Sequence, residues 1–458
     1  MARTEMQEIA ITSSDHILET SRDYSIYVCQ SRGIPSVCDG LKDSQRKALF
    51  VIKPLSDKIK TVSLSGLMIS SNCYLHGDVS ASEAISLMAA PYCNNVTLLQ
   101  GIGAFGTRVG PTDWGAPRYT YVKKSQHTER LIYPDYDIIP LKENYDGSVM
   151  EPQNFLPLIP LVLLNGISGI AVGWSTKILP RRFSDLVDAT LAVIDNKKTR
   201  PDLLPSYEYL GCEVKSLGGN SYEFTGRCSV GATTVTVTEL PPDLSLEDFR
   251  ARLNKMEDDD QITGYTDRST KDICVEVRFR RADIAGWTEA KALEFLKLRS
   301  KSTERLVVLD WTGNNIRQYD DAWQLIQEFV TWRLDWYRVR YEKLIADTTK
   351  LLNWNLALQA CMDKGLPAFL GKAANRAEIV DKIGVICAKI PLDADQLDRI
   401  AGLPSYRWAK DAYAEIVSKI AELTQTIADY QTVLNDPRKM RSIYREEVSA
   451  LKKLPAVR

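Results

Sequence analysis

Apolar residues recur at helical spacing along LKDSQRKALFVIK, which begins at Leu41. The glycines and the proline of the preceding SRGIPSVCDG break this pattern just before it. Another helix is predicted from about Asp78, a residue type that suits an N-cap. Residues 98–125 are instead rich in glycine, which is typical of loops and short strands.

A very apolar run, FLPLIPLVLLNGISGIAVGW, begins at Phe155 and is interrupted twice by proline. We predict a buried strand over Leu158–Leu163, and the glycines of NGISGIAVG indicate a close backbone approach to another group. Further along, TTVTVTELPPD and ICVEVRFR alternate polar and apolar residues, as strands with one buried face do. Residues 208–280 are therefore expected to belong to a second, α+β domain.

The C-terminal third is predicted to be helical, because no breaker interrupts residues 321–365. A second helix carries apolar residues spaced alternately by three and four, which is the seam of a coiled coil. The seam positions are Tyr413, Ile416, Ile420, Leu423, Ile427, Tyr430 and Leu434. Pro437 is expected to end or kink this helix. Two long helices joined by a knob form an antiparallel arm that suits a dimer contact, although a plain helical bundle fits the same pattern.

The composition is that of an ordinary globular protein of 458 residues, with 44% hydrophobic and 26% charged residues. No apolar run reaches the roughly 18 residues that a membrane span needs, so we expect no membrane association. The 9 cysteines are scattered without a CxxC pair, which fits a reducing cytoplasm and argues against a zinc ribbon.

The net charge of −1 argues against a protein that coats nucleic acid, but basic residues outnumber acidic ones in residues 30–60 and 118–130. Such local basic charge marks either a binding groove or a solvated face. Helices followed by a basic β-ribbon are similar to a winged helix-turn-helix, which docks on DNA.

The stretch GAPRYTYVKK contains two tyrosines, Tyr119 and Tyr121, that could act as nucleophiles. A phenol with a pKa of about 10 needs a nearby cation, base or metal, because its deprotonation at pH 7 costs about 4 kcal/mol. Arg118 is adjacent to Tyr119, but neighbours on a strand point to opposite faces. Arg118 can therefore assist Tyr119 only if the backbone is irregular there, as Gly115 and Pro117 suggest.

General-base assistance alone is too weak to cut a phosphodiester, so a metal ion is expected. The chain offers neither a convincing metal site nor a GxxxxGK[ST] phosphate loop. Another polypeptide would then supply the metal and any ATPase. His76, in YLHGD, is one of only 3 histidines, and local sequence leaves a functional and a structural role open.

Several motifs together resemble the DNA breakage–reunion subunits of type IIA DNA topoisomerases, the gyrase A and topoisomerase IV ParC-like family. They are RGIPSVCDGLKDSQRKALF, YLHGD, GIGAFGTR, APRYTY, NYDGSVMEP, FLPLIPLVLLNGISGIAVGWSTKILP and LNDPRKMRSIYREEV. The match runs from about residue 20 to 452 and most resembles the T-even-type bacteriophage members. It implies a multidomain α+β fold: a winged-helix DNA-cleavage domain (1–150), a tower domain (151–320), a coiled-coil arm (321–365 with 411–452) and a C-gate dimerisation knob (366–410).

The resemblance implies an ATP-hydrolysing type IIA topoisomerase whose Tyr119 attacks both DNA strands, each from one copy of a homodimer. Arg118 and Arg32 would steady the phosphate, and His76 would act in acid–base or transition-state chemistry. Further residues would contact double-stranded DNA: Lys42, Arg46 and Lys47 on the backbone, Lys123 and Lys124 on nearby phosphates, and Ile170 as a wedge between bases. Tyr121 would be structural.

The resemblance also places the cofactors on separate partner chains, with Mg²⁺ on a Toprim domain and ATP on an ATPase subunit. The expected location is the cytoplasm, that of the bacterial host if the chain is phage-encoded. The chain departs from the family at Leu75, Ile102, Ala104, Lys47, Val79 and Glu83. The last two predict weak fluoroquinolone sensitivity. Because no DNA-wrapping propeller follows residue 458, we expect relaxation and decatenation without negative supercoiling.

Two other functions stay open at this point. A non-catalytic architectural protein could combine a winged helix with a dimer arm, and would not need Tyr119. A different tyrosine enzyme is the second alternative. A tyrosine recombinase would need more catalytic arginines and histidines in a C-terminal helical domain, and a relaxase would need a paired-histidine metal site that isolated histidines cannot form.

Overall fold

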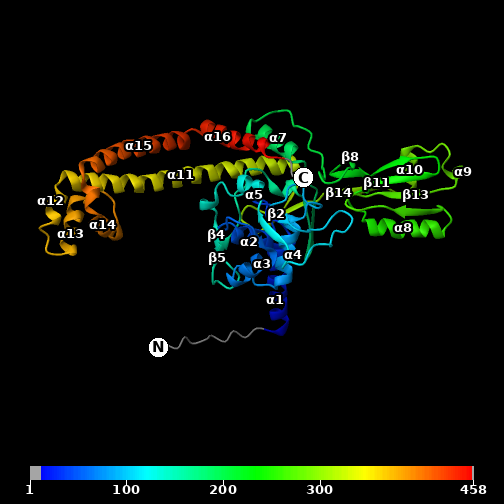
Figure 1. The fold of residues 1–458 in the computed structure, drawn as a ribbon, viewed down its shortest axis with the longest axis horizontal. Helices are drawn as coiled ribbons and strands as arrows, with labels where there is room; N and C mark the ends of the chain where they lie inside the picture. Colours follow the sequence, from blue (N-terminus) through cyan, green and yellow to red (C-terminus); the bar gives the residue numbers. More distant parts are fainter. Residues whose placement is uncertain (1–11, 456–458) are drawn as a thin grey trace. The chain divides into compact units, whose positions relative to one another are not determined.

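The computed structural model describes residues 12–455, and the chain divides into two compact units. The first comprises Met1–Arg333 and Arg445–Arg458, and the second comprises Leu334–Tyr444. Helices and strands mix in the first unit, whereas the second is built of helices (Figure 1). The four-part division predicted from the sequence is finer than these two units, and its boundaries stay a prediction. None of the helices within residues 12–455 combines the length and apolar composition that crossing a membrane requires.

Short helices form the N-terminal part of the first unit. They are α1 (Ser13–Val28), the π-helical turn η1 (Cys29–Gly33), α2 (Asp43–Ile52), α3 (Thr61–Ser70) and α4 (Asp78–Ala89). The helix predicted from about Asp78 is α4, although its N-cap is Gly77. The last three helices meet through fully buried apolar side chains at helical spacing: Leu49, Ile52, Leu64, Met68, Ala81 and Ile85.

A small antiparallel sheet, with its first strand between α2 and α3 and the other two after α4, supports the segment that contains Tyr119. Its strands are β1 (Ile59–Lys60), β2 (Leu99–Ile102) and β3 (Tyr121–Lys124), in the order β1-β3-β2. Tyr121 pairs with Ile102 on one side and with Lys60 on the other. Val122 points into the core and is fully buried, so β3 is fixed from its first residue.

The next part of the first unit alternates short helices with two hairpins. Its elements are α5 (Gln126–Leu131), η2 (Tyr136–Ile138), β4 (Leu141–Glu143), β5 (Met150–Pro152), α6 (Leu161–Leu164), β6 (Ile167–Ala171), β7 (Trp174–Ile178) and α7 (Phe183–Ile194). The buried strand predicted over Leu158–Leu163 is wrong. Pro160 is the N-cap of helix α6, since proline lacks the N–H that a strand needs and tolerates a helix start.

Residues 213–303 contain two antiparallel sheets with helices. The elements are β8 (Glu213–Gly218), β9 (Ser221–Thr225), β10 (Arg227–Val230), β11 (Thr234–Glu239), α8 (Leu246–Asp258), β12 (Gly264–Asp267), β13 (Val275–Arg278), α9 (Arg281–Ile284), α10 (Glu289–Phe295) and β14 (Arg299–Thr303). The sheet orders are β10-β11-β13-β12 and β14-β9-β8. The two alternating segments predicted as strands are β11 and β13, and they pair in one sheet with Val235 opposite Val277.

A last hairpin, β15 (Leu306–Leu309) and β16 (Ile316–Tyr319), holds the segment that follows η1. The N–H of Val37 donates to the Leu309 carbonyl at 3.0 Å, and the N–H of Leu309 donates to the Pro35 carbonyl at 2.8 Å. Ile34 packs with Leu309 in a buried cluster. Strand β15, from far along the chain, therefore fixes the backbone next to Arg32.

The second unit contains most of two long helices and a knob between them. The helices are α11 (Ala322–Asp363), α12 (Leu366–Leu370), α13 (Arg376–Ile386), α14 (Ala394–Ala401), η3 (Ser405–Trp408), α15 (Lys410–Asn435) and α16 (Pro437–Ala450), with the turn η4 (Leu451–Lys453) after them. Helix α15 runs antiparallel to α11 (Figure 1), since Tyr341 meets Tyr430 and Asp363 meets Tyr413. All seven predicted seam residues are buried or half-buried. The predicted break at Pro437 separates α15 from α16.

Candidate functional site

Tyr119 lies in a turn and not in a strand. Its N–H donates to the Ala116 carbonyl at 2.8 Å, and its side chain is 69% exposed. The Arg118 guanidinium lies over the Tyr119 ring, with its central carbon 4.7 Å from the ring centroid. Strand alternation does not apply in a turn, so two sequence neighbours can face the same side. The irregular backbone that the sequence suggested around Gly115 and Pro117 is therefore present.

The N-terminus of helix α3 holds this turn at both ends. The N–H of Val62 donates to the Pro117 carbonyl at 3.1 Å, and the N–H of Thr61 donates to the Thr120 carbonyl at 3.0 Å. The buried hydroxyls of Thr61 and Thr120 also meet at 2.8 Å. First-turn N–H groups have no partner inside their own helix, so here they are satisfied by the turn. Tyr119 is thus exposed on a rigid support.

Tyr121 has a different environment from Tyr119. It is the first residue of β3, its side chain is half-buried, and the Lys58 ammonium lies 5.1 Å from its ring centroid. Its backbone pairs on both sides of the strand. This placement makes Tyr121 part of the framework on which the turn rests.

A second cluster joins α1, η1 and the segment before α4. Nε2 of His76 lies 3.1 Å from the Tyr27 hydroxyl and 3.5 Å from a terminal nitrogen of Arg32. The Arg32 guanidinium carbon lies 5.6 Å from the Tyr27 ring centroid, and the Tyr74 ring meets His76 edge-on at 5.2 Å. The fold therefore brings together Arg32 and His76, two predicted site residues that are 44 residues apart in the sequence. Tyr27 is a member that the sequence did not indicate.

The cluster favours the neutral form of His76. Burial lowers the pKa of His76, and the positive charges of Arg32 and Lys47 lower it further, while Asp43 opposes them. Arginine can only donate hydrogen bonds, so Nε2 must be the acceptor in its contact with Arg32. This contact favours an imidazole that carries its proton on Nδ1. A cavity of about 200 Å³ borders this cluster, and its walls include Tyr27, His76 and Lys47.

The β6–β7 hairpin packs directly on η1 and presents Ile170. A side chain at Gly169 would collide with the Gly33 carbonyl, and one at Gly33 would collide with the side chain of Ala171. The close approach predicted for the glycines of NGISGIAVG is thus made to the backbone next to Arg32. Ile170 itself is 87% exposed, which is unusual for isoleucine.

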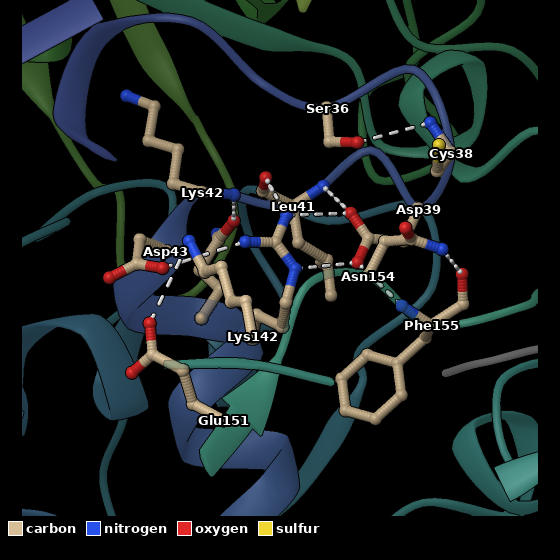
Figure 2. A network of polar contacts seen from close by, with 12 residues as sticks. Ser36, Cys38, Asp39, Leu41, Lys42, Asp43, Lys142, Glu151, Asn154 and Phe155 are labelled. Carbon is tan, nitrogen blue, oxygen red and sulfur yellow. Dashed lines mark hydrogen bonds and ion pairs between the residues drawn. The ribbon is translucent and has the colours of Figure 1, made fainter. Parts of the chain in front are cut away.

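Arg46 is buried, and its partner Asp39 belongs to the polar network shown in Figure 2. Its guanidinium donates to both carboxylate oxygens of Asp39 at 2.7 and 2.9 Å, and to the Leu41 carbonyl at 3.0 Å. Asp39 is fully buried and also accepts from the N–H groups of Leu41 and Phe155. Burial alone would lower the pKa of Arg46, but Asp39 and then Asp43 outweigh it and raise the pKa. The predicted contact of Arg46 with the DNA backbone does not fit this placement, because its guanidinium is buried and bonded to Asp39 and Leu41.

Lys47 and Lys42 also have partners within the chain. The buried Lys47 ammonium lies 2.8 Å from Asp43 and 3.0 Å from Glu151, and these carboxylates outweigh burial and raise the pKa of Lys47. The half-buried Lys42 ammonium donates to the Ser168 carbonyl at 3.0 Å, and burial lowers the pKa of Lys42. Lys42 thereby connects the start of α2 to the hairpin that carries Ile170.

The two lysines after Tyr121 differ, because successive strand residues face opposite ways. Lys123 is exposed. Lys124 points inward, where its ammonium donates to the Lys53 carbonyl at 2.8 Å and lies 2.9 Å from Glu129. The predicted phosphate contact therefore fits Lys123 and does not fit Lys124.

Within residues 12–455, no group of three or more His, Cys, Asp or Glu side chains is placed to hold a metal ion. Across the same residues, no hydrogen bond, ion pair or ring contact joins the Arg118–Tyr119 turn to the Arg32–His76 cluster. The candidate site consists of two basic clusters, one with an exposed phenol and one with a neutral imidazole.

The chain is similar to DNA topoisomerases over much of its length. The chain is 34% identical over 341 residues to DNA topoisomerase 2-alpha of Gallus gallus, and 32% identical over 344 residues to that of Homo sapiens. Each match covers 70% of this chain but 22% of the relative, so the chain spans about a fifth of these proteins. The crystal structure of the Plasmodium falciparum topoisomerase II DNA-binding, cleavage and re-ligation domain shares its fold, with a TM-score of 0.81 and 23% identity over 96% of this chain and 64% of that one.

A family profile matches a longer part of the chain than the two sequence relatives do. The profile of the DNA gyrase/topoisomerase IV A-subunits matches residues 32–449. This span includes the Arg118–Tyr119 turn, His76, the Ile170 hairpin and the long helices. The resemblance inferred from the sequence motifs is confirmed at the level of the family: the chain belongs to the DNA gyrase/topoisomerase IV A-subunit family.

Proposed function

We propose that this chain is the DNA breakage–reunion subunit of a type IIA DNA topoisomerase, with Tyr119 as its nucleophile. The observation that carries the proposal is the exposed Arg118–Tyr119 turn, in which a cation lies against the phenol and α3 fixes the backbone. The family assignment supports the reaction class. As the medium-sized subunit of a T-even-type enzyme, the chain would act in the cytoplasm.

In the proposed reaction the Tyr119 phenol oxygen attacks a backbone phosphorus. The phenol gives up its proton, a bond forms between that oxygen and phosphorus, the bond from phosphorus to the 3′-oxygen breaks, and the 3′-oxygen takes up a proton. The DNA 5′ end is left as a phosphotyrosine ester, so the number of phosphodiester bonds does not change. Resealing is the reverse attack, with the phenolate as leaving group, and needs no external energy.

Arg118 supplies charge where the reaction needs it. Forming the phenolate from a group with a pKa of about 10 costs about 4 kcal/mol at pH 7, and extra negative charge develops on the phosphate during attack. A fixed guanidinium beside the phenol stabilises both, and such positioned charge is a large contribution to catalysis. Mg²⁺ would add Lewis-acid stabilisation of the phosphate when the partner's Toprim domain supplies it.

The second cluster would act on the same phosphate or its neighbours. Arg32 is a donor for phosphate oxygens, and neutral His76 can accept or donate a proton near pH 7. Lys123 and Lys42 are assigned to the DNA backbone. Arg46, Lys47 and Lys124 are assigned to holding the fold, and they influence DNA only by positioning other groups.

Ile170 is proposed as the wedge that unstacks a base step and bends the duplex. An 87% exposed isoleucine near the end of strand β6 is suited to this, because apolar wedges unstack bases at a cost of about a few kcal/mol that bent-DNA contacts offset. The α2–α4 helices and the β1-β3-β2 sheet would act as the winged-helix part. Residues 213–303 would form most of the tower, and α11 with α15 the coiled-coil arm.

The active assembly is proposed to be a homodimer joined at the knob of residues 366–410, which brings one Tyr119 to each DNA strand. Separate chains would supply the ATPase and the metal-binding domain. The test is to mix all chains with plasmid and Mg²⁺, then denature with detergent. Linear DNA with protein on its 5′ ends, lost when a chelator is added before the detergent, is expected. DNA that stays intact with and without the chelator would overturn the proposal.

A further inference from the structure

The Tyr27 side chain contacts both Arg32 and His76, the two residues of the second cluster to which the family resemblance gives roles. Its hydroxyl is 3.1 Å from Nε2 of His76, and its ring face meets the Arg32 guanidinium at 5.6 Å. Tyr27 is half-buried, and its ring also contacts the Tyr145 ring, with the two centroids 5.4 Å apart. One aromatic side chain thus contacts both partners at once, through two different groups.

We infer that Tyr27 is a positioning residue: its hydroxyl fixes the ring and tautomer of His76, and its ring holds Arg32, before DNA binds. The inference rests on the proposed function, in which Arg32 and His76 act on the phosphate. Its physical reason is preorganisation, because side chains that are already in place need no reordering when the reaction begins.

The hydrogen-bond roles follow from the donors present. Arg32 can only donate, so the Nε2 lone pair accepts from it. A tyrosine hydroxyl can donate or accept, and beside an unprotonated Nε2 it must donate. The Arg32 contact favours an imidazole protonated at Nδ1, and the Tyr27 contact is compatible with that tautomer. Protonation at Nε2 would leave Arg32 without its acceptor and would turn the Tyr27 hydroxyl from donor into acceptor, so the contacts and the tautomer depend on each other.

Charged and titratable groups face His76 from every element around it. They are Tyr27 on α1, Arg32 on η1, Asp43 and Lys47 on α2, the adjacent Tyr74, and Lys142, Glu143, Tyr145 and Glu151 around the shared cavity. Among these groups, Tyr27 and Arg32 have hydrogen-bond distances to Nε2. The Tyr27 hydroxyl can be removed without changing any of the other groups.

Tyr27→Phe tests the hydroxyl alone, because phenylalanine keeps the ring that meets Arg32 and Tyr145. Its matched control is Tyr24→Phe, which removes a phenol hydroxyl one turn earlier on α1, where Tyr24 is 57% exposed. The first readout is an NMR titration of the full chain labelled at histidine Cε1, without DNA. The chain has 3 histidines, and a His76→Asn sample assigns the His76 signal.

Removing the donor withdraws an interaction that only unprotonated Nε2 can accept, so Tyr27→Phe is expected to raise the pKa of His76 and shift its tautomer toward Nε2–H. The second readout is the single-turnover rate of covalent adduct formation against pH, in the complete assembly with Mg²⁺. Loss of one hydrogen bond predicts a roughly two- to tenfold slower rate at neutral pH, at unchanged DNA affinity. Tyr24→Phe is expected to match wild type in both readouts.

An unchanged His76 titration in Tyr27→Phe would overturn the inference, as would a changed titration with an unchanged cleavage rate. A slower rate without any change in titration would also overturn it, because it would show a merely structural effect. Failure of the proposed function looks different: wild type itself then forms no adduct. The titration of the free chain would in that case still decide whether Tyr27 sets the state of His76.

Discussion

The guanidinium of Arg118 lies over the ring of Tyr119, with its central carbon 4.7 Å from the ring centroid. A cation–π contact at an exposed site contributes only about 0.5–1 kcal/mol, so its importance is in geometry more than in stability. It fixes a positive charge beside a phenol that is 69% exposed. Helix α3 holds the backbone at both ends of the turn, which keeps Arg118 and Tyr119 in place relative to each other.

Two replacements of Arg118 separate the effect of its charge on cleavage from the effect of its planar shape. Arg118→Ala is expected to slow covalent DNA cleavage by about 10²–10³-fold, the range seen when one positioned donor is removed from a reacting oxygen. Arg118→Lys keeps the charge but loses the planar fork, and should recover part of the rate. Single-turnover cleavage assays at saturating DNA measure both variants. Equal rates for Arg118→Ala and wild type would show that the contact has no catalytic part.

Arg46 is expected to matter for stability and not for DNA contact. Arg46→Ala leaves Asp39 as an unpaired buried charge, which predicts a loss of about 3–5 kcal/mol in the free energy of unfolding. Lys123→Ala, at an exposed position, should change it by no more than about 0.5 kcal/mol. Urea denaturation of both variants measures the difference.

The salt dependence of DNA binding separates the role proposed for Lys123, a phosphate contact, from the role proposed for Arg46, which is to hold the fold. Each phosphate contact contributes about 0.9 to the slope of log affinity against log salt. Lys123→Ala is expected to lower that slope by about one contact, whereas folded Arg46→Ala should retain the wild-type slope. A lower slope in Arg46→Ala would instead show that Arg46 contacts the DNA backbone, as the family resemblance implies.

Ile170 is expected to control DNA bending without contributing to the fold. Ile170→Ala removes most of an 87% exposed side chain, so the unfolding midpoint should stay close to that of wild type. The bend should decrease, because no wedge is left to unstack the base step. Energy transfer between dyes on the two DNA ends measures the bend. Val172→Ala, at a 54% exposed position after β6, is the control and should leave it unchanged.

Stability should fall with pH below neutrality because of His127, which is 5% exposed and packs edge-on against Phe183. Burial lowers the pKa of His127 below the ordinary 6.5. The unfolded chain therefore takes up this proton first as pH falls through 6.5, and the folded state loses stability by at most about 1.4 kcal/mol per pH unit. His127→Gln should flatten the slope in urea denaturation between pH 7 and 5. An unchanged slope would show that His127 is not its source.

Local patterns predicted the parts of the fold that depend on local spacing. The seam of α15, the break at Pro437 and strands β11 and β13 all follow from residues that are close in sequence. The strand predicted over Leu158–Leu163 was wrong because an apolar run has no period that separates a buried strand from a buried helix. The decisive signal was Pro160, which cannot donate a strand hydrogen bond but can begin a helix.

The candidate site could be predicted only as far as residue types allow. The family motifs selected Tyr119, Arg118, Arg32 and His76, but charge alone could not separate exposed from buried cations. Glu151, which pairs with Lys47, and Phe155, whose N–H donates to Asp39, lie more than 100 residues away in sequence. Asp39, the acidic residue of CDGLK, was an available signal that a nearby cation such as Arg46 has a partner within the chain. Nothing in the sequence pointed to Tyr27, because its partner His76 is 49 residues away.

The most direct test of the central claim compares Tyr119→Phe with Tyr121→Phe in the complete assembly. Each variant loses one phenol hydroxyl, and the two positions are separated by a single residue. With DNA and Mg²⁺ followed by detergent, Tyr121→Phe should give protein attached to 5′ DNA ends as wild type does, whereas Tyr119→Phe should give none while still binding DNA. A 5′ adduct formed by Tyr119→Phe, or its loss in Tyr121→Phe alone, would contradict the assignment of Tyr119 as the nucleophile.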